Sequence, residues 1–115
     1  MSTVRHKPAK ILSAAVEANG MVYVAGTVAD KVPASVKAQT AEILDKIDAL
    51  LAAAGSNKSK IVSATIWVAD IRFRDEMNEA WLAWVDPANL PARACIQAAL
   101  ANPQMFVEIA VIAVK

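Results

Sequence analysis

Three side chains that could take part in ionic or acid–base chemistry lie within two otherwise apolar segments. Arg93 and Cys95 belong to the segment ARACIQAAL, and Glu108 belongs to FVEIAVIAV. A guanidinium keeps its charge when it is partly removed from water, and its planar fork matches a carboxylate through two parallel hydrogen bonds. A partly buried carboxylate such as Glu108 can hold or activate a water molecule as a general base. These residue types are therefore suited to binding a small organic acid and directing water at it.

The residues alone leave another interpretation of the two charges equally open. Arg93 and Glu108 can form a structural ion pair, either across a hairpin or between subunits. If the two segments form a hairpin that turns near Asn102-Pro103, Glu108 lies opposite Gln97 and not opposite Arg93. Direct pairing of the two charges therefore does not follow from the sequence.

Composition excludes several classes of function. The chain has 115 residues, a net charge of +1 and no run of basic residues with interleaved aromatics, so nucleic acid is not expected as a ligand. One cysteine and one histidine, Cys95 and His6, cannot form a transition-metal cluster, and without a nearby base Cys95 is expected to pack as a small apolar residue. No segment has the pattern of a secretory signal or a membrane span. We expect one cytoplasmic domain over residues 1–115 that uses no metal.

Apolar periodicity predicts the elements that must position these side chains. Asn19-Gly20 is the pair best suited to a type I′ turn, which predicts a hairpin over 14–25. Apolar residues spaced three and four apart predict a helix between Ser35 and Gly55 and a second helix after Asp70 that ends before Pro87. Strands are expected over 4–6 and 62–69, and the segments 92–100 and 106–114 are expected to form a closing hairpin.

This order predicts an α+β domain in which two helices cover one face of a mixed sheet. In both closing strands the apolar residues share one side, so Arg93, Gln97 and Glu108 are expected on the face away from the helices. That face is too apolar to be left in water. We expect it to be buried by association into a closed ring, with the charges lining clefts between subunits.

A set of motifs in this order is similar to a known family. The segments YVAGTVAD, AQTAEILDKIDALLAAAG, IVSATIWVADI, MNEAW and PARACIQAAL followed by VEIAVIAV resemble the reactive-intermediate deaminase family, also called RidA or YjgF. The resemblance implies a chorismate-mutase-like fold in the order β-β-β-α-β-α-β-β and a homotrimer with pockets at its subunit interfaces. It also implies cofactor-free hydrolysis of enamine and imine intermediates to 2-keto acids and ammonium.

The resemblance assigns roles to several residues of this chain. It implies that Arg93 holds the substrate carboxylate, that Cys95 and Asn78 line the pocket, and that Glu108 orients the attacking water. The resemblance also places four further positions in the pocket, two of which lack the hydroxyl of the family pattern: Leu12 in place of tyrosine, Ala25 in place of serine, Gly26, and Thr27 where glutamine is frequent.

The missing hydroxyls leave alternatives to deaminase activity. The loss of two hydrogen-bonding groups should weaken the orientation of substrate or water and favour a more apolar substrate. A second hypothesis is a non-catalytic trimer that binds small carboxylates or a partner protein. A third, ribonuclease or translation inhibitor, echoes labels used for the family and has no support in the charge pattern.

Overall fold

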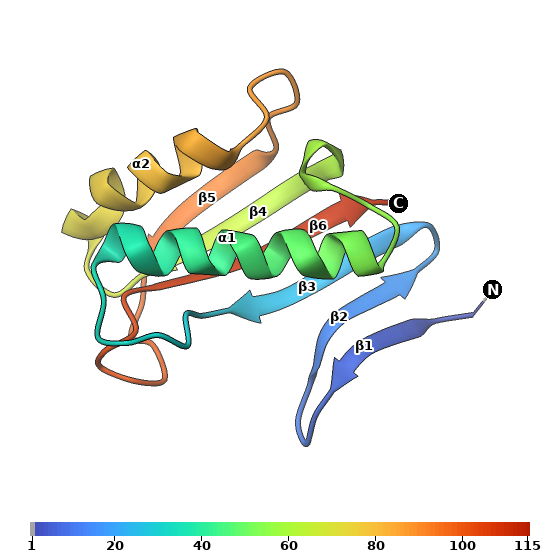
Figure 1. Cartoon of the computed structure of the whole chain (residues 1–115), viewed down its shortest axis with the longest axis horizontal. Helices are drawn as coiled ribbons and strands as arrows, with labels where there is room; N and C mark the ends of the chain where they lie inside the picture. The colour runs from blue at the N-terminus through green and yellow to red at the C-terminus, as the bar shows by residue number, and fades with distance from the viewer. Residues whose placement is uncertain (1) are drawn as a thin grey trace.

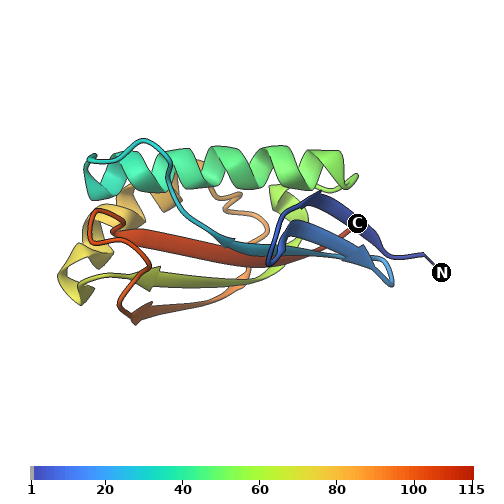
Figure 2. The same cartoon turned by 90° about the horizontal axis from the view of Figure 1, so that it is seen from below.

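The structure is a computed structural model that describes residues 2–115. Its elements are β1 (Val4–Pro8), β2 (Ser13–Ala18), β3 (Met21–Thr27), α1 (Val36–Ala53), β4 (Ile61–Val68), α2 (Arg74–Trp84), β5 (Ala92–Gln97) and β6 (Val107–Val114), with short 3₁₀ turns at Lys58–Lys60 and Ile71–Phe73. The strands form one mixed sheet in the order β1-β2-β3-β6-β4-β5. Both helices lie on the same face of this sheet (Figure 1), and the opposite face carries no helix (Figure 2). The predicted order of elements and the predicted layers are confirmed.

The Asn-Gly pair makes the turn that the sequence predicts. Asn19 has a φ of 52° and Gly20 a φ of 74°, so both residues adopt the left-handed conformation that a type I′ turn requires. The turn sets Ala18 opposite Met21 and pairs β2 with β3 in antiparallel fashion. A further antiparallel strand, β1, lies outside β2 and confirms the short strand expected before the hairpin.

The first helix begins and ends where its capping residues predict. The hydroxyl of Ser35 accepts a hydrogen bond from the backbone N–H of Ala38 at 3.0 Å, which satisfies one free donor of the first turn. After the helix, Gly55 has a φ of 79° and turns the chain away. The inward face of α1 packs on the sheet through fully buried aliphatic side chains, among them Ile43, Leu44, Ile47 and Leu51.

The segment from β4 to α2 differs in detail from the prediction. A bulge between Ile61 and Ser63 turns Ile61 into the core and leaves Val62 46% exposed. Asp70 caps the 3₁₀ turn that follows β4 by accepting from the N–H of Arg72 at 2.9 Å. The second α-helix therefore starts only at Arg74, without a side-chain cap.

The predicted closing hairpin is wrong. β5 pairs in parallel with β4, which makes β4, α2 and β5 a βαβ unit, whereas β6 is inserted antiparallel between β3 and β4. The expected pairing of Glu108 with Gln97 is therefore also wrong, because both residues are paired with β4 and not with each other. Glu108 is paired with Trp67, and Gln97 is paired with Val68.

The fully buried side chain of Gln39 on α1 explains why the segment between β5 and β6 does not turn tightly. Its Nε2 donates to the backbone oxygen of Gln104 at 2.9 Å, and its Oε1 accepts from the N–H of Phe106 at 2.9 Å. The segment is thereby drawn under the start of α1, and β6 enters the middle of the sheet. A polar residue on the apolar stripe of a helix was the signal in the sequence.

The face of the sheet without helices is mainly apolar. Tyr23 on β3 and Ser63 on β4 flank Ile112 of β6 on this face, and Thr65 and Ala110 form the next row. Tyr23 is 45% exposed. No helix in the part of the chain that the structure describes is long and apolar enough to cross a membrane.

Candidate functional site

Arg93 lies on the helix-covered face of the sheet, so its predicted orientation is wrong. In the parallel pairing of β4 with β5, Arg93 is level with Ala64 and Cys95 with Ile66, and both β4 residues belong to the buried core. Laterally paired residues share a face of a sheet. The apolar residues of β5 instead face outward, as the 47% exposure of Ile96 shows. The prediction failed because the apolar residues of this edge strand do not mark the face that the helices cover.

The Arg93 guanidinium is held by two residues of α2. Its Nη1 donates to Oδ1 of Asn78 at 2.7 Å, and its central carbon lies 5.3 Å from the ring centroid of Trp81. Trp81 is 5% exposed and forms a rigid floor beneath the charge. Within residues 2–115, Asn78 is the only hydrogen-bond partner of this guanidinium, so further N–H donors remain available to a ligand.

Partial burial also affects the electrostatics of Arg93. Removal from water lowers the pKa of the guanidinium below its ordinary value. An arginine nevertheless stays protonated at neutral pH. A fixed, poorly hydrated cation of this kind favours a planar anion such as a carboxylate.

Trp81 was not identified as a site residue from the sequence, although a signal was present. Asn78 and Trp81 are three residues apart on a helix, and this spacing places two side chains on the same side. An amide oxygen next to an indole ring can bind a guanidinium through a hydrogen bond and a cation–π contact. By its spacing, Trp81 was predicted only as part of the apolar stripe of the helix.

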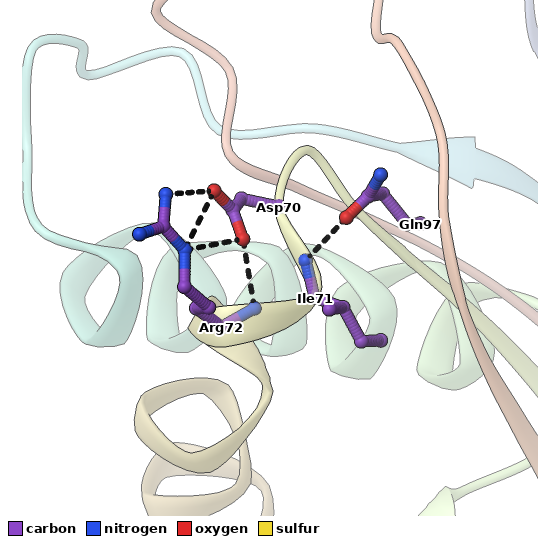
Figure 3. A network of polar contacts seen from close by, with 4 residues as sticks. All are labelled: Asp70, Ile71, Arg72 and Gln97. Atoms are coloured by element: carbon purple, nitrogen blue, oxygen red, sulfur yellow. Dashed lines mark hydrogen bonds and ion pairs between the residues drawn. The ribbon is translucent and has the colours of Figure 1, made fainter.

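A second group of contacts lies where the end of β5 meets the 3₁₀ turn that precedes α2 (Figure 3). Oε1 of Gln97 accepts a hydrogen bond from the backbone N–H of Ile71 at 2.8 Å. Beside it, Asp70 forms an ion pair with Arg72 at 2.6 Å, and the hydrogen bonds from Arg72 lower the pKa of Asp70 to about 2. Gln97, like Arg93, was expected on the other face of the sheet, and that prediction is wrong. The hydrogen bond of Gln97 to Ile71 joins the end of β5 to the turn before α2, and these two elements carry Arg93 and Asn78.

Cys95 lies two residues after Arg93 on β5, on the same face of the sheet, and is partly buried against the core. The single histidine lies elsewhere: Nε2 of His6 is 2.6 Å from Glu17 near the opposite edge of the sheet. Within residues 2–115 no group of three or more His, Cys, Asp or Glu side chains is arranged to hold a metal ion. We call Asn78, Arg93 and Cys95 the arginine half-site.

Glu108 lies on the other face of the sheet, as the sequence predicts, and its carboxylate lies against Gly26 of β3. A Cβ atom added to Gly26 would meet this carboxylate, with the Cδ atom of Glu108 at 3.1 Å. β3 has a bulge here, because Thr27 is three positions after Val24 while their partners on β6 are two positions apart. The bulge brings the bare backbone of β3 close to the carboxylate.

The carried-over residues of β3 and the preceding segment line a cavity of about 390 Å³. Leu12, Ala25, Gly26 and Thr27 form one side of it, and Lys46 of α1 lies on another. Nζ of Lys46 donates to the backbone oxygen of Val28 at 2.7 Å, and it lies 2.8 Å from Asp30. Glu108 does not line this cavity, and Gly26 lies between the two. We call Leu12, Ala25, Gly26, Thr27 and Glu108 the glutamate half-site.

One chain does not bring the two half-sites together. Arg93 is level with Ala64 of β4, whereas Glu108 is paired with Trp67, three residues further along that strand. This offset is about 10 Å along the strand, and the two side chains leave the sheet on opposite faces. No ion pair joins Arg93 to Glu108 in the part of the chain that the structure describes. A small ligand cannot touch both groups of the same chain.

Comparison with known proteins gives a consistent assignment. A family model described as Endoribonuclease L-PSP matches residues 3–115. The chain is 41% identical to a RutC family protein of Haemophilus influenzae over 114 residues, which are 98% of both chains. It is 44% identical to the RutC family protein YoaB of Escherichia coli over 95 residues, 83% of this chain and 82% of that one.

A solved structure extends the comparison from sequence to fold. The crystal structure of a YjgF family member from Neisseria meningitidis matches with a TM-score of 0.96 and 39% identity, over 100% of this chain and 96% of the other. Family model, relatives and structure agree over nearly the whole chain. The chain therefore belongs to the RidA/YjgF family that its motifs indicate.

Proposed function

We propose that this protein hydrolyses reactive 2-imino acids and their enamine tautomers to 2-keto acids and ammonium without a cofactor. The active site is formed between subunits of a homotrimer, with the arginine half-site of one subunit facing the glutamate half-site of the next. Members of this family are generally reactive-intermediate deaminases. The helix-free, largely apolar face of the sheet supports association.

The observation that carries the proposal is the preorganised guanidinium of Arg93. Asn78 fixes it from one side and the Trp81 ring supports it from below, while other N–H donors stay free. Holding a bound imine in one orientation next to a water molecule makes the bimolecular reaction effectively unimolecular, which can supply much of the rate acceleration. The carboxylate clamp is thus expected to affect turnover as well as binding.

Glu108 supplies the complementary function. Its carboxylate accepts a proton from a water molecule, whose oxygen adds to the imine carbon, while the imine nitrogen takes up a proton from solvent. Glu108 then returns its proton to the amino group of the carbinolamine. The C–N bond breaks as the hydroxyl becomes the carbonyl of the keto acid, and the hydroxyl proton leaves with the ammonia as ammonium. Water is the only co-reactant, so the reaction is redox-neutral.

Turnover of imino acids made in place by an amino-acid oxidase tests the proposal. The wild-type protein is expected to accelerate release of 2-keto acid above the spontaneous rate, and Arg93→Ala to remove that acceleration. Arg93→Lys keeps the charge and loses the fork, so partial activity is expected. Arg72→Ala is the control because Arg72 is largely exposed and pairs with Asp70. Absence of acceleration by the wild-type protein would refute the deaminase assignment.

A second candidate function is a non-catalytic binder of small carboxylates or of a partner protein. It is favoured by Leu12 and Ala25, which place apolar groups where the family pattern has hydroxyls. If it is correct, wild-type protein binds 2-keto acids without turnover, and Leu12→Tyr combined with Ala25→Ser gains activity. Robust wild-type turnover would exclude it.

The family description also names an endoribonuclease, and the charge distribution argues against that activity here. A net charge of +1 provides little attraction for a phosphate backbone. We expect no RNA cleavage and no RNA binding that weakens steeply with salt. Such binding by the pure protein would require this function to be reconsidered.

A further inference from the structure

A cavity of about 310 Å³ adjoins the arginine half-site on the side of α2. Arg93 and Asn78 supply its polar end, and Trp81, Leu82 and Leu90 are among the side chains of its apolar wall. The volume falls at the lower end of the range for small-molecule pockets. A cation at one end of an apolar cavity is complementary to an apolar carboxylic acid.

Two leucines of this wall have no cover in the described part of the chain. Leu82 is 73% exposed and Leu90 is 66% exposed, although both are large aliphatic side chains next to a charged group. Trp81, in contrast, is buried and packs against Trp84 with the two rings tilted and their centroids 5.5 Å apart, so its position is fixed. The wall therefore combines a rigid aromatic floor with two open aliphatic sides.

The contacts of Arg93 determine where a ligand can approach. Asn78 takes Nη1 and the Trp81 ring occupies one face of the guanidinium, so a carboxylate must use donors that open into the cavity. The carbon chain attached to that carboxylate then lies along Trp81. A ligand with only a methyl group would leave most of the apolar wall in contact with water.

We propose that the preferred substrates are 2-imino acids with a bulky apolar side chain, such as isobutyl or benzyl, held against Trp81 between Leu82 and Leu90. For the hydrolysis step this inference rests on the proposed function. The selectivity itself concerns binding, and the stable 2-keto acid with the same carboxylate and side chain reports it without turnover. Additional carbons buried on the wall strengthen binding in proportion to the apolar area that they remove from water.

The test compares 2-keto acids with methyl, isobutyl and benzyl side chains by calorimetry on the intact protein. The isobutyl and benzyl acids are expected to bind at least about tenfold more tightly than the methyl acid. Leu82→Ala together with Leu90→Ala should reduce this ratio by about fivefold or more. Ile11→Ala is the matched control, because Ile11 is 91% exposed and lies outside this cavity, and it should leave the ratio unchanged.

The outcomes separate this inference from the proposed function. Selective binding of bulky acids without turnover would support the inference and refute the deaminase assignment. Turnover with equal affinity for methyl and isobutyl acids would retain the deaminase assignment and overturn the inference. An unchanged ratio in the double leucine variant would overturn the inference. If the assembly formed by this variant also differs in molecular mass from that of the wild type, the two leucines contact a neighbouring subunit and not the ligand.

Discussion

The carboxylate of Glu108 occupies the space beside Gly26 that the methyl group of an alanine would need. We expect Gly26→Ala to displace this carboxylate and to lower the turnover number by about tenfold or more, because general base catalysis requires the carboxylate within reach of its water. Affinity for 2-keto acids should change little, since Arg93 is on another half-site. Steady-state kinetics and calorimetry check the two effects separately.

A double-mutant cycle provides the control for Gly26→Ala. If the substitution acts only through Glu108, adding it to Glu108→Gln should cause no further loss of turnover. Full additivity of the two losses would mean that the methyl group disturbs something else, such as the bulge of β3.

Asn78 positions Arg93, and its two simplest substitutions should differ in effect. Asn78→Ala removes one hydrogen bond and is expected to weaken binding of 2-keto acids severalfold, in line with about 1 kcal/mol for such a bond. Asn78→Asp keeps the shape and adds a charge that competes for the guanidinium, so its loss should be larger. Equal affinities of the Ala variant and the wild type would remove Asn78 from the binding site. Thermal unfolding checks that both variants stay folded.

Gln39 is expected to be the most sensitive polar residue of the core. Gln39→Ala should lower the free energy of unfolding by roughly 2–4 kcal/mol, because it leaves the backbone groups of Gln104 and Phe106 without partners and creates a cavity. Gln104→Ala is the matched control, since its side chain is exposed and only its backbone oxygen is used. Urea unfolding measures both. Similar losses in the two variants would contradict the assigned role.

The ion pair of Asp70 with Arg72 predicts a dependence of stability on pH. The pKa of Asp70 falls from 3.8 to about 2 on folding, so its contribution is complete above the unfolded pKa and disappears as the pH falls through the folded pKa. The stability advantage of wild type over Asp70→Asn should therefore shrink between about pH 4 and about pH 2. Urea unfolding of both proteins at several pH values provides the measurement. A constant difference over that window would disprove the linkage.

Association through the helix-free face can be tested at Tyr23. Tyr23→Glu places a charge beside Ile112 at the centre of that face and should convert the expected trimer to monomers with loss of turnover. Ala52→Glu adds the same charge on the exposed side of α1 and should leave the mass unchanged. Light scattering during size-exclusion chromatography reads out the mass. A monomeric wild-type protein would contradict the proposed interface.

The elements were predictable where local chemistry determined them. The Asn19-Gly20 turn, the cap at Ser35 and the periodic stripe of α1 depend on neighbouring residues, and the structure confirms them. Strand pairing was less accessible because it depends on distant contacts. The side chain of Gln39 draws the segment before β6 under α1, and no local pattern near β6 announces this.

For the candidate site, the sequence placed its charged residues in the correct strands but did not predict their geometry. The positions of Arg93 and Glu108 in strands followed from sequence, but the face of Arg93 was wrong, because the alanines of an edge strand fit either face. The contacts of Arg93 with Asn78 and Trp81 could not be predicted, because they depend on where α2 packs relative to β5. Because the two half-sites lie on opposite faces, the proposed site requires a second subunit, which one sequence does not describe.

The central position of β6 also has a consequence for synthesis of the protein on the ribosome. β6 is the last of the six strands to be translated, yet it joins β3 to β4 and supplies the buried Val107, Ile109 and Val111. Until residues 107–114 have emerged, β3 and β4 each expose an unpaired edge and the nascent chain holds two incomplete sheets. The core and the carboxylate of Glu108, the proposed general base, are thus completed by the same late event, so no partly translated chain carries a complete glutamate half-site.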